Sequence, residues 1–151
     1  MIVTAKTLEE TKTFARRIAP NVAIGRPLLL YGDLGTGKTE FAREIIRTLA
    51  ERVGMNPAAL GDIPSPTFSL LQLYDLGVAE IAHYDLYRLK SAAELQELDF
   101  EESLRNRAVI IEWPELAEPF VKNAMRVKIE IDGAERQITF DMPPSPRHPA
   151  I

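Results

Sequence analysis

The stretch that decides the fold of this chain runs from residue 32 to residue 39: Gly32, Asp33, Leu34, Gly35, Thr36, Gly37, Lys38 and Thr39. These residues fit G-x-x-x-x-G-K-[ST], the pattern of a phosphate-binding loop, at every constrained position. The glycines let the backbone wrap closely enough for its N–H groups to surround phosphate oxygens. Lys38 places a positive charge beside β- and γ-phosphates, and the Thr39 hydroxyl can ligate Mg²⁺.

The segments on either side of this loop have the secondary structure that a phosphate loop requires. Residues 27–31 form a short apolar run, which is typical of a buried central strand. Residues 38–53 carry apolar side chains at a helical period, and Gly54 follows as a C-cap. A glycine-rich turn that matched by accident would not need these neighbours. We therefore predict a strand, a phosphate loop and a helix whose free amides and dipole face the anion.

The remaining sequence predicts a single domain over residues 1–142 and a disordered, proline-rich tail over residues 143–151. Capping boxes are expected at Thr7 and at Ser91, because a glutamate stands three residues after each. The other predicted elements are a helix from Thr7 to Pro20, a hairpin of residues 68–74 and 78–84, a short helix from Ser91 through Leu98, a buried strand over residues 108–112 and a hairpin of residues 125–131 and 136–140.

Composition narrows the class of protein. The 151 residues carry a net charge of −4, which does not favour general binding to nucleic acids or anionic membranes. The chain has no cysteine, so disulfides and thiolate metal sites are excluded. The N-terminus lacks the pattern of a secretory signal, and no apolar run is long enough to cross a bilayer. We therefore expect a cytoplasmic protein that makes no membrane contact.

The acid that completes a metal site in such hydrolases usually ends a buried strand, and Glu112 ends the predicted strand over residues 108–112. Its carboxylate would lie across from Thr39 and hold Mg²⁺ directly or through water. The alternative is a glutamate that points to solvent. Trp113 follows, either as a packing aromatic or as a wall of the site.

Two further stretches carry candidates for the chemistry. Asp85 and Arg88 stand three residues apart at the end of the first hairpin, where they could lie over the γ-phosphate or brace a turn. His83 alone is more often structural than a catalytic base. Thr67 lies in the loop before that hairpin and could sense the γ-phosphate, as in several nucleotide hydrolases, or belong to an ordinary turn. No sequence pattern for guanine recognition is present, so ATP is the expected nucleotide.

Four stretches of this sequence together resemble one family, TsaE (also called YjeE), the ATPase component of bacterial tRNA threonylcarbamoyladenosine modification. The family pattern is Gly-Asp-Leu-Gly-x-Gly-Lys-Thr, then Ser-Pro-Thr-[Phe/Tyr]-x-Leu, then His-x-Asp-x-Tyr-Arg, then a strand that ends in Glu-Trp. Here these stretches are residues 32–39, 65–70, 83–88 and 112–113. The resemblance covers about residues 7 to 140. It implies an α/β fold, namely a small P-loop NTPase-like three-layer domain with a mixed, largely parallel sheet.

The resemblance also implies roles for individual residues, with ATP and Mg²⁺ as the bound groups. Thr39 and Glu112 match the metal ligands, Asp85 matches the aspartate tied to hydrolysis, and Thr67 matches a switch-like threonine. Lys38 would stabilise charge on the phosphates. The nucleotide contacts implied are residues 32–39 together with Glu40 and, at the adenine end, Thr11. One departure is Asp99, which stands where a glycine is common.

In this family the ATPase acts on the complex of a carbamoyl-transferring subunit and its inactive homologue, and it contacts tRNA only indirectly. The resemblance therefore implies slow, partner-stimulated ATP hydrolysis that drives or resets that complex. Two alternatives remain open on the sequence: a small P-loop kinase that acts on a metabolite or nucleotide, and a nucleotide-binding module with little turnover.

Overall fold

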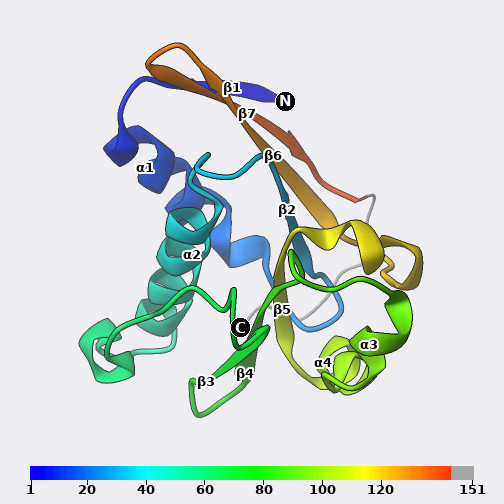
Figure 1. Ribbon diagram of the computed structural model, residues 1–151. Helices are drawn as coiled ribbons and strands as arrows, with labels where there is room; N and C mark the ends of the chain where they lie inside the picture. Colours follow the sequence, from blue (N-terminus) through cyan, green and yellow to red (C-terminus); the bar gives the residue numbers. More distant parts are fainter. Residues whose placement is uncertain (144–151) are drawn as a thin grey trace.

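The computed structural model describes residues 1–143, and it contains one seven-stranded mixed sheet in the order β1-β7-β6-β2-β5-β4-β3 (Figure 1). Strands β6, β2, β5 and β4 run parallel to one another, whereas β7, β1 and β3 join the sheet through antiparallel pairings. The strands are β1 (Ile2–Ala5), β2 (Leu28–Tyr31), β3 (Leu71–Asp75), β4 (Glu80–Asp85), β5 (Ala108–Glu112), β6 (Met125–Asp132) and β7 (Glu135–Asp141). The sheet is mixed, as predicted, with its parallel strands at the centre.

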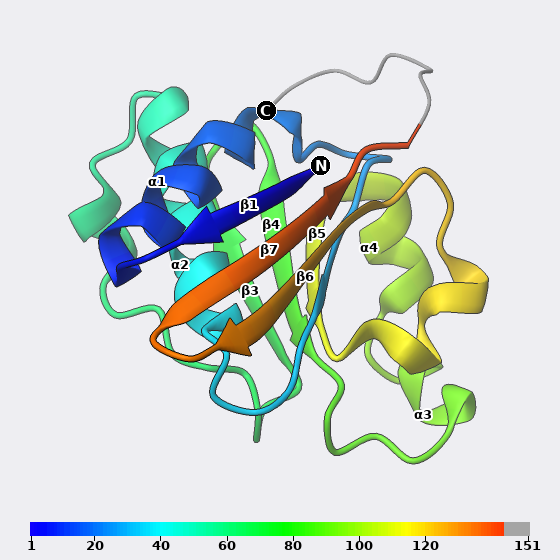
Figure 2. The same cartoon turned by 90° about the horizontal axis from the view of Figure 1, so that it is seen from above.

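Helices cover both faces of this sheet (Figures 1 and 2). On one face lie α1 (Leu8–Ile18) and α2 (Lys38–Arg52), and on the other lie α3 (Ala92–Gln96) and α4 (Phe100–Asn106). Side chains of β2 alternate between the two cores: Leu28 and Leu30 pack on the α1–α2 side, and Leu29 packs on the other. A strand that is buried on both faces consists of a continuous apolar run, which is why residues 27–31 could be predicted as a central strand. The three-layer arrangement implied by the family resemblance is confirmed.

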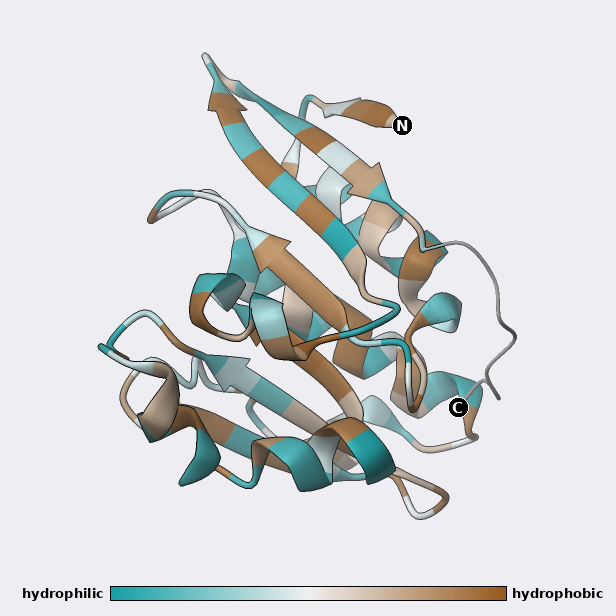
Figure 3. Cartoon of the chain, turned by 90° about the vertical axis from the view of Figure 1, so that its right-hand side faces the viewer, coloured by the Kyte–Doolittle hydropathy of each residue, from teal (hydrophilic) through white to brown (hydrophobic). Residues whose placement is uncertain are grey.

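The β6–β7 hairpin is open to solvent on one face. Figure 3 shows bands of apolar and polar residues alternating along it. Val127 and Ile129 face the α1–α2 core, whereas Lys128 and Glu130, which alternate with them, are exposed. This period-2 alternation is what predicted the hairpin from sequence.

Two predictions about local structure are wrong. Ser91 is the N-cap of α3, but its hydroxyl accepts no hydrogen bond, and the Glu94 carboxylate accepts the N–H of Lys90 (2.9 Å) instead of completing a capping box. The short helix also ends at Gln96, before Leu98, and the separate helix α4 follows. Asp99 separates them in the left-handed region, with φ 54°, a conformation that favours glycine.

Other segments follow the prediction with shifted ends. The capping box at Thr7 forms as expected, because Thr7 and Glu10 each accept the N–H of the other at 3.1 Å. Strand β3 begins at Leu71, so Phe68 lies in the turn before it. Short 3₁₀ helices are η1 (Ala19–Asn21), η2 (Pro57–Leu60), η3 (Pro114–Leu116) and η4 (Glu118–Phe120). No helix among residues 1–143 is long and apolar enough to cross a membrane. Residues 144–151 of the predicted tail lie outside the described residues.

Candidate functional site

The phosphate-loop residues 32–39 connect β2 to α2 at the carboxyl ends of the parallel strands, where ligands of open α/β sheets bind. Gly37 is the N-cap of α2 in the left-handed region (φ 105°). Gly32 (φ 145°) lies so close to β6 that a Cβ atom there would be 2.5 Å from the Ile129 carbonyl oxygen. The same atom would be 2.7 Å from the Thr36 hydroxyl. Only glycine fits at residue 32 without moving the loop.

Lys38 is folded back onto the loop. Its ammonium group donates to the carbonyls of Gly32 (2.6 Å) and Asp33 (2.7 Å), and it lies 4.2 Å from the centroid of the Trp113 ring. Burial lowers the pKa of Lys38, and the nearby carboxylate of Glu112 opposes that shift. The structure therefore places Trp113 in the wall of the site, above the lysine that the sequence assigns to the phosphates.

A chain of two hydrogen bonds joins α2 to the centre of the sheet through Glu112. The Thr39 hydroxyl donates to Glu112 Oε1 (2.7 Å), and His83 Nε2 donates to Glu112 Oε2 (2.6 Å). Glu112 is buried, so the alternative in which it points to solvent is wrong. Because Thr39 and Glu112 present adjacent oxygen atoms, they can bind one Mg²⁺ ion, which prefers oxygen ligands.

Asp85 ends β4 directly opposite Glu112 in the parallel register of β4 and β5. Its carboxylate accepts the Thr67 hydroxyl (2.9 Å) and the Tyr87 N–H (2.9 Å), and burial raises its pKa. Arg88 does not share this site. It is exposed, with its guanidinium 5.1 Å from the centroid of the Phe68 ring, so the placement of Arg88 over the γ-phosphate is wrong. Asp85 braces its turn through a backbone N–H instead.

These side chains line a cleft of about 350 Å³ beside the loop. The predicted residues that meet there are Leu34, Gly35, Gly37, Lys38, Thr39, Glu40, Thr67, Asp85 and Glu112. Arg43, which the sequence did not single out, also lines the cleft and pairs with the Glu40 carboxylate one helical turn earlier. The cleft combines two buried carboxylates, three hydroxyls, a lysine and an arginine, which suits a polyphosphate with a divalent cation.

Thr11 lies on another side of the loop. It is buried on α1 and lines a smaller cleft, of about 140 Å³, together with Thr36, Gly37 and Arg136. The Arg136 guanidinium donates to the Thr36 carbonyl (3.2 Å). Thr11 therefore lies beside the loop but does not line the main cleft, and its contact with the adenine end of a nucleotide stays a prediction.

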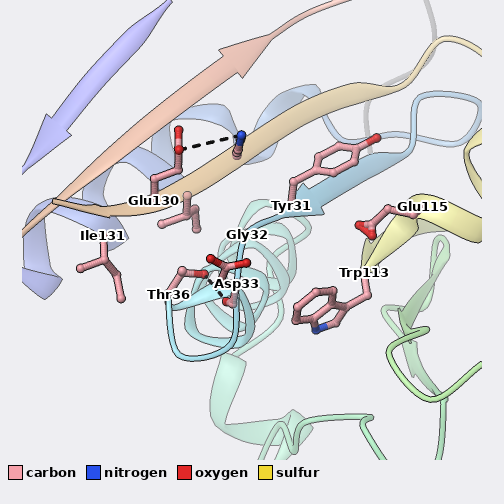
Figure 4. A pocket seen from close by; sticks show the side chains of 10 residues that line it. Tyr31, Gly32, Asp33, Thr36, Trp113, Glu115, Glu130 and Ile131 are labelled. Carbon is pink, nitrogen blue, oxygen red and sulfur yellow. Dashed lines mark hydrogen bonds and ion pairs between the residues drawn. The ribbon is translucent and has the colours of Figure 1, made fainter.

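A further groove, of about 470 Å³, lies between the loop and the end of β6 (Figure 4). Gly32, Asp33 and Thr36 form one side of it, and Tyr31 and Trp113 lie across from the side chains of β6. The predicted residues of the loop thus divide between this groove and the main cleft. Trp113 lines both.

A family model described as Threonylcarbamoyl adenosine biosynthesis protein TsaE matches residues 5–138, from the end of β1 into β7. The chain belongs to this family. A curated TsaE protein of Rickettsia prowazekii (strain Madrid E) is 46% identical over 113 residues, covering 75% of this chain and 74% of the relative. The TsaE protein of Bacillus subtilis (strain 168) is 35% identical over 136 residues, covering 87% and 79%.

A solved structure shares the fold of this chain. The crystal structure of Bacillus subtilis YdiB matches with a TM-score of 0.69 and 27% identity, covering 95% of this chain and 86% of that chain. TsaE proteins are involved in tRNA threonylcarbamoyladenosine biosynthesis, as both curated relatives are named. The four sequence stretches that resemble the family, far apart along the chain, each contribute side chains to the 350 Å³ cleft.

Proposed function

We propose that this protein binds ATP with Mg²⁺ in the 350 Å³ cleft and hydrolyses it as an accessory ATPase of tRNA threonylcarbamoyladenosine biosynthesis. One observation carries the proposal. Lys38 and Thr39 of the loop meet Thr67, Asp85 and Glu112 from three other segments in a single cleft. The family to which the chain belongs supplies the biosynthetic context.

The loop and helix α2 would hold the phosphates. The first N–H groups of a helix lack intrahelical partners, and the helix dipole adds positive potential there, so the start of α2 at Lys38 favours an anion. Lys38 now donates to two loop carbonyls. Bound phosphate oxygens, which are charged, are better acceptors than these carbonyls, and the lysine would turn toward them.

Thr39 and Glu112 would hold Mg²⁺, with the nucleotide completing its coordination. Residues 1–143 contain no group of three or more His, Cys, Asp or Glu side chains able to hold a metal. Mg²⁺ typically uses one or two carboxylates plus substrate phosphates, and the adjacent oxygens of Thr39 and Glu112 fit that requirement. When bound, Mg²⁺ would offset the charge that develops on the β- and γ-phosphate oxygens.

Asp85 would orient the attacking water for in-line displacement at the γ-phosphate. Its carboxylate lines the cleft beside Glu112 and is fixed from two sides by Thr67 and Tyr87. Burial raises the pKa of Asp85, which makes the carboxylate a better proton acceptor. Thr67 couples this carboxylate to the loop before β3, so the loop can respond to the γ-phosphate.

We propose that a protein partner binds beside the cleft, and that this partner is the carbamoyl-transferring subunit with its inactive homologue. Three large apolar side chains are exposed beside residues of the site: Leu34 (65%), Phe68 (82%) and Tyr87 (49%). Exposed apolar side chains next to a binding site can contribute to an interaction surface. Each belongs to a segment that also contributes a residue to the cleft, so a partner seated there would contact the same segments as the nucleotide.

The test is ATP binding and hydrolysis by the purified protein, with and without these partners, for the wild type, Lys38→Ala and Glu112→Ala. Lys38→Ala should weaken ATP binding about 10- to 100-fold, since a charge-assisted hydrogen bond contributes about 1.5–3 kcal/mol. Glu112→Ala should abolish the turnover that the partners stimulate. Lys122→Ala is the matched control and should behave as the wild type, because Lys122 is exposed and lines none of the clefts at the loop. Tight ATP binding without stimulated turnover would sink the hydrolytic role, and transfer of phosphate to a metabolite would indicate a kinase.

A further inference from the structure

His83 lies outside the cleft yet contacts its central acid. The side chain is fully buried (0% exposed) in the middle of β4, and Nε2 donates to Glu112 Oε2 at 2.6 Å. His83 and Asp85 share a sheet face with Glu112, because β4 and β5 pair in parallel with Asp85 opposite Glu112. The histidine is paired with Ile110 and thus sits two residue pairs deeper in the sheet than the carboxylates of the site.

The second ring nitrogen of His83 has no partner in the part of the chain that the structure describes. Nδ1 is buried and accepts no hydrogen bond, so Glu112 is the residue that satisfies the ring. An unpaired buried nitrogen costs free energy, and an apolar side chain of the same size would fill this position without that cost. A role in packing alone leaves the polar ring unexplained.

We propose that His83 is a positioning residue, which holds one oxygen of Glu112 so that the other faces the metal beside Thr39. This inference rests on the proposed function, because it takes the Mg²⁺ site to be at Thr39 and Glu112. The terminal torsion of a glutamate is broad and roughly two-fold, so a carboxylate at a strand end can rotate. A donor fixed at Oε2 stops that rotation and directs Oε1 toward the Thr39 hydroxyl.

His83 acts through Glu112 and not on the substrate. It is excluded from solvent and is not among the residues that line the cleft, so it cannot touch a nucleotide or an attacking water there. Hydrogen-bond partners behind a metal ligand fix the orientation of that ligand, and their loss typically weakens metal affinity or activity about 10- to 100-fold. The measurable consequence is therefore a change in metal requirement.

The test compares three variants of the full chain. In His83→Gln the amide nitrogen is as many bonds from the backbone as Nε2 and can still donate to Glu112. In His83→Asn the amide nitrogen is one bond closer to the backbone and cannot reach Glu112, and His83→Leu has no donor. The Mg²⁺ concentration that gives half-maximal tightening of ATPγS binding is measured by calorimetry, and ATPγS binding in EDTA provides the reference.

We expect His83→Leu and His83→Asn to need about 10- to 100-fold more Mg²⁺. His83→Gln should stay close to the wild type, and all variants should bind ATPγS equally in EDTA. In a Glu112→Gln background, His83→Leu should add nothing, because Glu112 already carries the effect. If His83→Leu fails to fold, as judged by circular dichroism and urea unfolding, the isopolar Gln and Asn pair decides the question.

Three results would overturn the inference: a wild-type Mg²⁺ requirement in both His83→Asn and His83→Leu, an equal loss in Gln and Asn variants, or an undiminished effect of His83→Leu without Glu112. Failure of the proposed function looks different. A wild-type protein that binds ATPγS with Mg²⁺ but never hydrolyses ATP would refute the ATPase role, and the Mg²⁺ titrations would still support or overturn the role of His83.

Discussion

Asp85 and Lys38 are two ionisable side chains of the site whose burial disfavours their charged forms. Burial raises the pKa of Asp85 and lowers that of Lys38, since removal from water penalises the ionised form of each. The two hydrogen bonds that Asp85 accepts, from Thr67 and Tyr87, only partly offset this penalty. A charged group kept at a cost to stability is typical of a functional site.

Asp85→Asn should therefore be more stable than the wild type near pH 7. Because the pKa of Asp85 is higher in the folded than in the unfolded protein, the folded wild type binds more protons between these two pKa values, and its stability falls as pH rises from the usual pKa of aspartate to the raised pKa of the folded state. This advantage of the neutral variant should shrink as pH falls through the raised pKa, and it should be lost below the usual pKa of aspartate. Urea unfolding across pH measures it. The exposed Asp132→Asn is the control, and an advantage of Asp85→Asn that does not vary with pH would contradict the explanation.

Residues whose type and spacing are set by phosphate chemistry could be predicted from the sequence. Lys38, Thr39 and Glu112 belong to this group, and they do lie together. The contact of His83 with Glu112 and that of Arg88 with the Phe68 ring could not be predicted. Both depend on the register of β4 against β5 and on the direction in which the chain leaves β4, which short-range patterns do not encode.

At the scale of elements, the connection from β2 to α2 is shaped by close approach to β6. Gly32 has a positive φ and no room for a side chain, whereas Gly35 has a positive φ (78°) with nothing within 4 Å of an added Cβ. Gly35 is therefore required for its backbone conformation alone. Gly32 is required both for its conformation and for its close contact with the Ile129 carbonyl.

Gly32→Ala should destabilise the protein more than Gly35→Ala. Each substitution carries the strain of a positive φ, of order 1–3 kcal/mol, but only the first also forces Ile129 and Thr36 to move. Gly32→Ala should also weaken ATP binding, because the displaced loop carries the amides that would surround phosphate. Urea unfolding and calorimetry measure the two effects. Equal destabilisation by both variants would show that the contact with β6 is unimportant.

Local structure also explains why some elements could not be predicted from the sequence. Strand β1 lies at the edge of the sheet, where it pairs with β7, and its four residues are too few to show an extended pattern. The division between α3 and α4 depends on Asp99 in the left-handed region, where an aspartate gives a weaker signal than a glycine. The buried strands β2 and β5 were recognisable because both of their faces are apolar.

For the molecule as a whole, the parallel centre of the sheet brings the ends of β2, β4 and β5 to one edge, and α2 begins there. Segments as distant along the chain as Thr39 and Glu112 are joined directly at this edge. A ligand that contacts both segments would bind the folded state and not the unfolded chain. Binding should therefore increase the free energy of unfolding of the whole domain.

Mg²⁺ with ATP at 100 times the dissociation constant should stabilise the wild type by about 2.7 kcal/mol. For a domain of this size that corresponds to a rise in Tm of roughly 5–10 °C. Chelation of Mg²⁺ should reduce the rise. Lys38→Ala should cut the stabilisation to about 0.4–1.4 kcal/mol at the same ATP concentration, because its affinity is expected to be about 10- to 100-fold weaker. Thermal unfolding measures all three. A rise that is identical in Lys38→Ala would mean that ATP binds elsewhere.

The placement of Trp113 against Lys38 gives this protein an intrinsic optical label. The chain has one tryptophan, so all of its indole emission comes from a ring 4.2 Å from the loop's ammonium group. That cation would leave the ring if Lys38 turned toward a phosphate, and the local field that sets the emission would change. Empty and loaded loops are then distinguishable by light alone, in real time and on unmodified material, including while a partner that lacks tryptophan associates and departs.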